Sequence, residues 1–132
     1  MRKANISIIA VLLIACFFVA VAPVSAKTVT SESCITIPPK EARAYYLSPG
    51  VKGDWTCKLS INYPMVIGAK AQKVSFAWRQ GSGTLHTWYS TTMSAGKTIK
   101  VPFHSGSSDI NYVVTVSNPS SIVTSVACIN IY

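Results

Sequence analysis

The chain has 132 residues, of which 49% are hydrophobic and 12% are charged, and it carries a net charge of +8 at pH 7. This length allows one domain with a core of its own. The basic residues are scattered and lysine outnumbers arginine, which argues against a surface that reads nucleic-acid bases, so we expect no nucleic-acid partner.

Residues 1–26 have the organisation of a cleavable secretory signal. A short basic start is followed by an apolar run over residues 6–21, and small residues precede a cleavage site between Ala26 and Lys27. We therefore predict that residues 27–132 form a single secreted domain, which works outside the cytoplasmic membrane.

Two other fates of this segment stay open. The sequence Leu13-Ile14-Ala15-Cys16 resembles a bacterial lipobox, which would anchor the protein through a lipid on Cys16, although the residues that follow are too apolar for a solvated tether. The apolar run is also long enough to serve as an uncleaved membrane anchor, against which Pro23 and the small-residue site argue. Mass spectrometry of the mature N-terminus distinguishes the three.

The first part of the predicted domain, residues 27–56, has poor hydrophobic periodicity, and we expect it to be largely irregular. A short strand over residues 33–37 is expected to end at Pro38-Pro39, because proline lacks the donor that a strand ladder needs. Residues 41–46 are expected to form one helical turn.

From Cys57 to the C-terminus, apolar and polar residues alternate, as in strands with one buried face. Gly, Ser, Asn and Pro mark the turns between them, and Pro102 predicts an edge strand. The predicted strands cover residues 57–63, 73–79, 85–91, 99–104, 110–117 and 122–132. Together with the short strand near Cys34, they predict an all-β fold, a small antiparallel β-sandwich of about six to eight strands.

Three cysteines follow the predicted signal, namely Cys34, Cys57 and Cys128, and an extracellular location would let a disulfide persist. We favour Cys34–Cys57, because this bond would constrain the irregular segment. Cys57–Cys128 is the alternative, since Cys57 shares the alternation of the strand that follows it. The remaining thiol is then either an inert core residue in a monomer or the link of a disulfide-bonded dimer.

Catalytic and metal-binding patterns are weak. His86, His104 and Asp109 are residue types of a hydrolase triad, but no nucleophile-elbow sequence accompanies them. No pair of ligand residues has a known metal-site spacing. We therefore expect no enzymatic activity, no metal and no cofactor.

Tyrosine and tryptophan are abundant, and their placement depends on the turn over residues 81–83. A two-residue loop would pair Phe76 with Tyr89 and turn Trp88 to the opposite face, whereas a three-residue loop would pair Trp88 with Phe76 and bury it. We favour the first, because it keeps Leu85 and Tyr89 on the Phe76 side. An exposed aromatic and basic patch would then comprise Lys73, Arg79, His86 and Trp88.

These features predict a non-enzymatic binding protein. After loss of residues 1–26, eight lysines and two arginines face four acidic residues, a net charge of +6 that favours anionic partners. We expect binding to an anionic envelope polymer, a polysaccharide or a membrane surface. The alternatives are a membrane-active toxin or antimicrobial protein, an inhibitor that inserts a stapled loop over residues 34–57 into an extracellular enzyme, and a structural protein of a surface layer.

Overall fold

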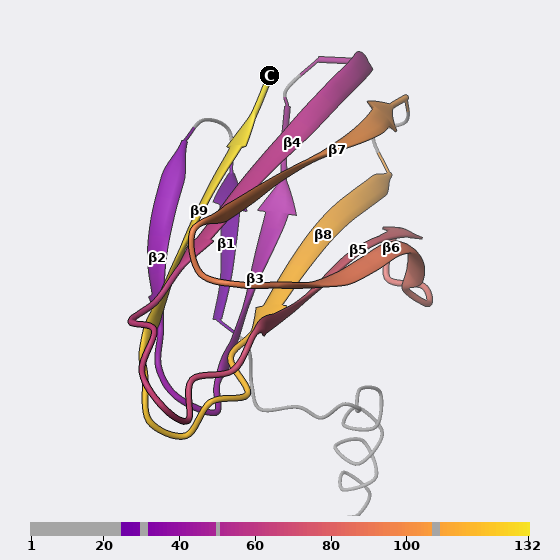
Figure 1. The fold of residues 1–132 in the computed structure, drawn as a ribbon. Coiled ribbons are helices and arrows are strands. Elements are labelled where there is room, and N and C mark those ends of the chain that lie inside the picture. Colours follow the sequence, from indigo (N-terminus) through magenta and orange to yellow (C-terminus); the bar gives the residue numbers. More distant parts are fainter. Residues whose placement is uncertain (1–24, 30–31, 50, 107–108) are drawn as a thin grey trace, which may run out of the picture.

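The computed structural model describes residues 25–29, 32–49, 51–106 and 109–132, and they form an all-β sandwich (Figure 1). A five-stranded sheet contains, in spatial order, β1 (Ser25–Val29), β3 (Ala42–Leu47), β8 (Ile110–Ser117), β5 (Gln72–Gln80) and β6 (His86–Met93). A four-stranded sheet contains β2 (Ser33–Ile37), β9 (Ser125–Ile131), β4 (Gly53–Asn62) and β7 (Lys97–Ser105). Neighbouring strands are antiparallel except β1, which runs parallel to β3.

The predicted all-β sandwich is confirmed. Each strand predicted after Cys57 is present, and Pro102 lies on β7, an edge strand of the four-stranded sheet. The described residues form nine strands, of which eight pair antiparallel with a neighbour, in line with the predicted six to eight, and β1 is added in parallel to β3. Within these residues no helix could cross a bilayer.

The expectation of an irregular segment over residues 27–56 was wrong. Three strands and the start of a fourth lie there. The short strand predicted over residues 33–37 is confirmed as β2, whereas the predicted helical turn is the strand β3. Its side chains alternate in burial, with Tyr45 and Leu47 facing the core, because β3 pairs along its whole length with β8. The predicted cleavage site between Ala26 and Lys27 falls within β1, whereas the apolar run and Cys16 lie outside the described residues.

Along the chain, successive described strands switch between the two sheets, and β5 and β6 are the exception because they form a hairpin in one sheet. Strands from both halves of the chain therefore interleave around one core. The largest fully buried apolar side chains are Tyr45, Phe76, Ile37, Leu59, Ile61 and Ile129. The hydrophobic effect that drives burial of these side chains holds the two sheets together.

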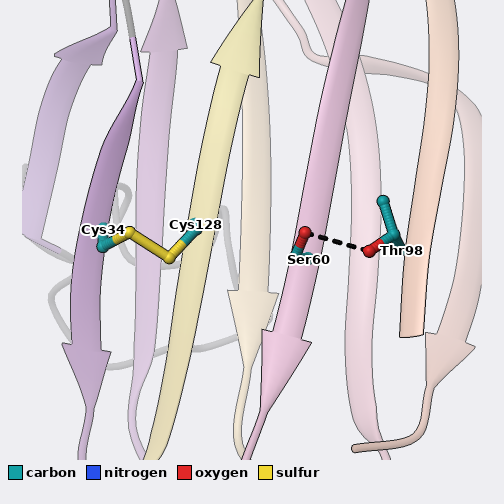
Figure 2. The surroundings of a disulfide bond; sticks show 4 residues. All are labelled: Cys34, Ser60, Thr98 and Cys128. Carbon is teal, nitrogen blue, oxygen red and sulfur yellow. Dashed lines mark hydrogen bonds between the residues drawn. A yellow bond between two sulfur atoms is a disulfide. The ribbon is translucent and has the colours of Figure 1, made fainter. Parts of the chain in front are cut away.

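The disulfide joins Cys34 to Cys128, not to Cys57 as predicted, nor is the alternative Cys57–Cys128 formed. Cys34 and Cys128 lie directly opposite one another on β2 and β9, with their Cα atoms 4.0 Å apart. Figure 2 shows this bond on the outer face of the four-stranded sheet, beside the hydrogen bond between Ser60 and Thr98. The strand neighbours decide the pairing, and these could not be inferred from the spacing of the cysteines.

The free thiol of Cys57 faces the opposite way, into the core, and is fully buried. Cys57 therefore cannot form a disulfide with a second chain while the protein is folded. The inhibitor hypothesis also loses its basis, because no bond closes residues 34–57 into a stapled loop.

One end of the sandwich is held together by Asn118, whose side chain is buried in the β8–β9 loop. Its amide nitrogen donates to three backbone carbonyls, those of Ile37, Pro38 and Val123, at 3.1, 3.3 and 2.9 Å. Its oxygen accepts from the side chain of Gln72 at 3.0 Å and from the backbone of Ser120 at 3.1 Å. Ser125 completes the network by donating to Gln72 at 2.7 Å. Buried polar groups satisfied in this way fix the loops without an unpaired donor.

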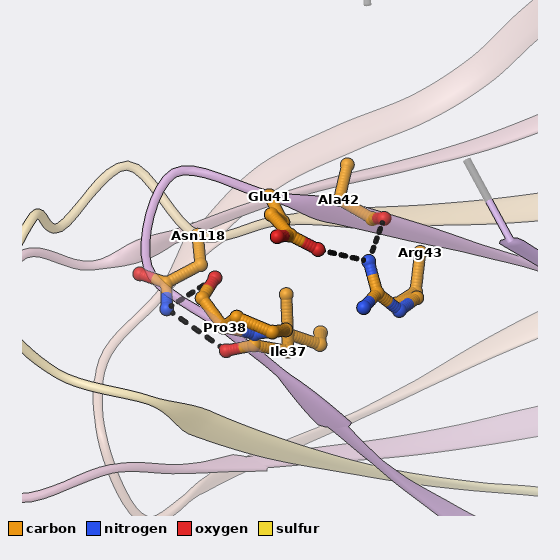
Figure 3. Close-up of polar contacts among 6 residues, drawn as sticks. All are labelled: Ile37, Pro38, Glu41, Ala42, Arg43 and Asn118. Atoms are coloured by element: carbon orange, nitrogen blue, oxygen red, sulfur yellow. Dashed lines mark hydrogen bonds and ion pairs between the residues drawn. The ribbon is translucent and has the colours of Figure 1, made fainter. Parts of the chain in front are cut away.

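Figure 3 shows how the turn between β2 and β3 is held from two sides. Asn118 binds the carbonyls at the end of β2, and Arg43 on β3 forms an ion pair with Glu41 at 2.9 Å while donating to the Ala42 carbonyl. We call this part of the molecule the anchored end, defined by the loops over residues 38–41, 63–71, 94–96 and 118–124.

Candidate functional site

The β5–β6 hairpin carries all four residues of the predicted patch, and its turn lies at the end of the sandwich opposite the anchored end. Its turn begins at Gly81, whose φ of 57° is in the left-handed region that glycine tolerates. Gly83 donates to the Gln80 carbonyl, and Gly81 donates to the Asp109 carbonyl at the start of β8. We call this part of the molecule the open end, because the tips of the hairpin and of β7 diverge there (Figure 1).

A β-bulge in β6 sets the direction of the aromatic side chains. Phe76 pairs with Tyr89, as in the favoured two-residue register, but Trp78 pairs with His86, as in the three-residue register. The register changes between these two pairs, and Trp88 is the extra residue. Each proposed register therefore holds on one side of the bulge, because a bulge sets two residues of one strand against one residue of its neighbour.

The bulge gathers aromatic rings on the inner side of the hairpin. The rings of Trp88 and Tyr89 both lie 5.9 Å from that of Phe76, and Trp88 also meets Tyr112 edge-on at 6.2 Å. His86 stacks on Trp78 with 4.5 Å between ring centres. We call the partly exposed members of this group the aromatic cluster, which comprises Trp78, His86, Trp88, Tyr89 and Tyr112.

The aromatic cluster is solvent-accessible because the facing sheet turns away from it. Met93, at the other end of β6, is only 2% exposed, whereas Trp88 is 37% and Tyr89 is 40% exposed. Phe103 of β7 still contacts Tyr112 at 5.1 Å, and the Tyr112 hydroxyl donates to the His104 carbonyl. Burial raises the pKa of Tyr112, so its phenol stays protonated and able to donate at neutral pH.

The outer face of the same hairpin is different in character. A shallow groove crosses β8, β5 and β6, where Ser75 lies between Thr115 and Ser90, and Lys73 lies between Ser117 and Thr92. We call these side chains the hydroxyl groove. It offers five hydroxyl groups and one ammonium group, and these can donate hydrogen bonds to a polar or anionic ligand.

The predicted patch of Lys73, Arg79, His86 and Trp88 is not assembled as expected. Lys73 and Arg79 lie on the outer face, on opposite sides of Ser75 and about 20 Å apart at the usual rise per strand residue. His86 and Trp88 contribute to the aromatic cluster on the inner side. The bulge separates them, because beyond it the alternation of β6 is displaced by one residue.

The residues considered for a catalytic triad have partners outside the triad. His104 pairs with Asp54 across β4 and β7, with 2.7 Å between Nδ1 and Oδ1, and both side chains are exposed. Asp109 accepts instead from Gln80, and His86 stacks on Trp78. Among the described residues, no three His, Cys, Asp or Glu side chains lie together in a way that could hold a metal ion.

No protein-family model matches the sequence, and a search of curated proteins finds no match. Solved structures share the fold. The chain resembles the Yersinia pseudotuberculosis-derived mitogen with a TM-score of 0.56 and 12% identity over 75% of this chain and 81% of the mitogen. It resembles PirA with a TM-score of 0.52 and 10% identity, over 77% and 94% of the two chains.

A third similar structure is the pre-peptidase C-terminal domain of the Bacillus anthracis collagenase, with a TM-score of 0.50 and 13% identity over 86% of this chain and all of that domain. At such low identity these likenesses show the fold alone. The chain is therefore a small two-sheet β protein whose architecture recurs among other small β-rich proteins and domains.

Proposed function

We propose that this protein is a secreted, non-enzymatic module that binds a polysaccharide of a cell envelope through the aromatic cluster. The observation that carries the proposal is the partly exposed position of Trp88, which meets Tyr112 edge-on and shares its hairpin with the stacked pair of Trp78 and His86. These rings combine apolar faces with polar nitrogen atoms, which suits a ligand that has both carbon–hydrogen faces and hydroxyl groups.

Three further observations support a binding role outside the cell. The Cys34–Cys128 disulfide is consistent with an oxidising compartment. The net positive charge would attract acidic polymers over a long range. The histidines are engaged in a ring stack and in an exposed pair with Asp54, an arrangement that gives no reason to propose hydrolysis.

Retention on purified wall polymers tests this function. We expect the protein to bind an uncharged wall polysaccharide and an acidic wall polymer, with added salt weakening only the second. Trp88→Ala should lower the affinity for both by about tenfold, the effect of losing an aromatic contact worth about 1.4 kcal/mol.

Tyr132→Ala is the matched control, because Tyr132 is an exposed aromatic residue outside the cluster. It should bind as the unmodified protein does. Equal retention of Trp88→Ala and the unmodified protein would contradict the proposal. It would also be contradicted if the unmodified protein bound neither polymer.

A further inference from the structure

The β4–β5 loop at the anchored end exposes three consecutive apolar residues. Met65 is 80%, Val66 51% and Ile67 98% exposed, which is far more than an apolar run of a folded domain usually shows. We call Met65, Val66 and Ile67 the apolar tip. This surface lies at the opposite end of the sandwich from the aromatic cluster.

The apolar tip is held in place by the fold. The Ala69 amide donates to the Val66 carbonyl at 3.0 Å, closing a turn in which Gly68 has a φ of 95°. Ile122 packs so closely on Gly68 that a Cβ atom there would lie 2.6 Å from the Ile122 Cδ1 atom. Ser120 Oγ also donates to the Gly68 carbonyl at 3.4 Å. The loop is therefore fixed to the β8–β9 loop, which Asn118 holds.

Ile122 adds to the same apolar surface, since it is itself 54% exposed beside Gly68. Four apolar side chains from two loops thus project together at one end of the molecule. Met65 and Ile67 are 80% and 98% exposed, so their further burial requires contact with something outside this domain.

Charge is distributed unevenly between the two ends. Exposed lysines occupy the loops and strand starts at the anchored end, namely Lys40, Lys70, Lys73 and Lys97. Among the described residues at this end, Glu41 is the acidic one, and its carboxylate is paired with Arg43. The other acidic residues, Glu32, Asp54 and Asp109, lie towards the open end.

We propose that the apolar tip inserts into the surface of an anionic phospholipid bilayer while the surrounding lysines contact the headgroups. Short apolar segments flanked by basic residues bind membranes by combining apolar burial with attraction to anionic lipids. The long axis of the sandwich then points away from the bilayer, and the aromatic cluster stays accessible at the far end. This contact is independent of polysaccharide binding.

Flotation with lipid vesicles tests the proposal. The secreted form, cleaved after Ala26 as predicted, should float with vesicles of phosphatidylcholine mixed with phosphatidylglycerol, and much less with phosphatidylcholine alone. The double variant Met65→Ser/Ile67→Ser should reduce binding to the anionic vesicles at least about tenfold, because the inserted apolar area is lost. Val51→Ser is the matched control, as Val51 is an exposed apolar residue outside this end, and it should bind normally.

A second pair of variants tests the role of the lysines. Lys70→Gln/Lys97→Gln should weaken binding to the anionic vesicles at least about fivefold. Lys58→Gln/Lys100→Gln removes the same net charge from the outer face of the four-stranded sheet and should have a smaller effect.

The position of the tip can be read directly. Ile67→Cys labelled with an environment-sensitive dye should show a blue shift on anionic vesicles, and labelled Val51→Cys should not. Cys57 is buried and should not react with the dye.

The inference fails if the Met65→Ser/Ile67→Ser variant floats like the unmodified protein, or if the unmodified protein does not float. It also fails if these substitutions change the oligomeric state in ultracentrifugation instead of vesicle binding, because the tip would then cover a second copy of the chain. Trp88→Ala should leave flotation unchanged, which separates this result from that of the polysaccharide test.

Discussion

The two ends of the sandwich are built from the same strands but differ in burial: one end buries polar side chains, and the other exposes aromatic ones. At the anchored end, Gln72, Asn118 and Ser125 are buried, and their polar atoms bond one another and the loop backbone. At the open end, rings on the same β5 strand and its neighbour are left half-exposed where the facing sheet turns away. Hydrogen bonds between buried polar groups fix the loops at the anchored end, whereas the open end keeps aromatic side chains exposed to a ligand.

The largest expected effect is at the anchored end. Asn118→Ala removes a donor to three carbonyls and the acceptor for Gln72, leaving several buried polar groups unpaired. We expect the free energy of unfolding, measured with urea, to fall by about 3–4 kcal/mol. Asn111→Ala is the control, because Asn111 is exposed and donates to the Gly81 carbonyl at the open end; it should cost less than about 1 kcal/mol. Similar losses for the two variants would remove the distinction between the ends.

The second prediction concerns the core between the two ends, where the buried thiol of Cys57 makes stability depend on pH. Burial raises its pKa from about 9 to about 12. Above pH 9 the unfolded chain releases this proton while the folded chain retains it, so stability is complete below about pH 9 and is lost as the pH approaches the folded pKa. We expect Cys57 to account for a loss of about 2–2.5 kcal/mol between pH 9 and about 11.

Urea unfolding of the unmodified protein and of Cys57→Ala over this pH range isolates the thiol. The variant should lose less stability, although Tyr45 acts in the same direction at higher pH because burial raises its pKa as well. Parallel pH profiles for the two proteins would show that the thiol does not titrate as its burial implies.

The smallest effect on stability is expected at the open end. Trp88→Ala removes a ring that packs on Phe76 and Tyr112 but is 37% exposed, so unfolding should become easier by only about 1 kcal/mol. Thermal unfolding measures this change beside the tenfold loss of polysaccharide affinity. A loss of stability as large as that of Asn118→Ala would identify Trp88 as a core residue and argue against a binding role.

Sequence periodicity predicted the fold well where strands have one buried face. The strand β8 was placed at its observed bounds, and β5 within a residue. The strand β3 was missed because Ala42, Arg43 and Ala44 lack the β-branched or aromatic side chains that mark strands, and only tertiary pairing with β8 decides their conformation.

The candidate site was harder to predict, because it depends on which strands pair with one another and in which register. The disulfide depends on β2 lying beside β9, a contact between segments far apart in sequence. The aromatic cluster depends on the bulge at Trp88, which splits a single register into two. The apolar tip did carry a signal, because Met65, Val66 and Ile67 follow Pro64 without the alternation of a strand.

The interleaving of strands also bears on how the chain reaches its folded state. The strand β2 pairs with β9, and Cys34 bonds a cysteine 94 positions later. Such a fold has a high contact order, which predicts slow folding. The strand β2 therefore gains its neighbour only after β9 has been synthesised, so the four-stranded sheet is completed later than the pairing of β4 with β7 allows on its own.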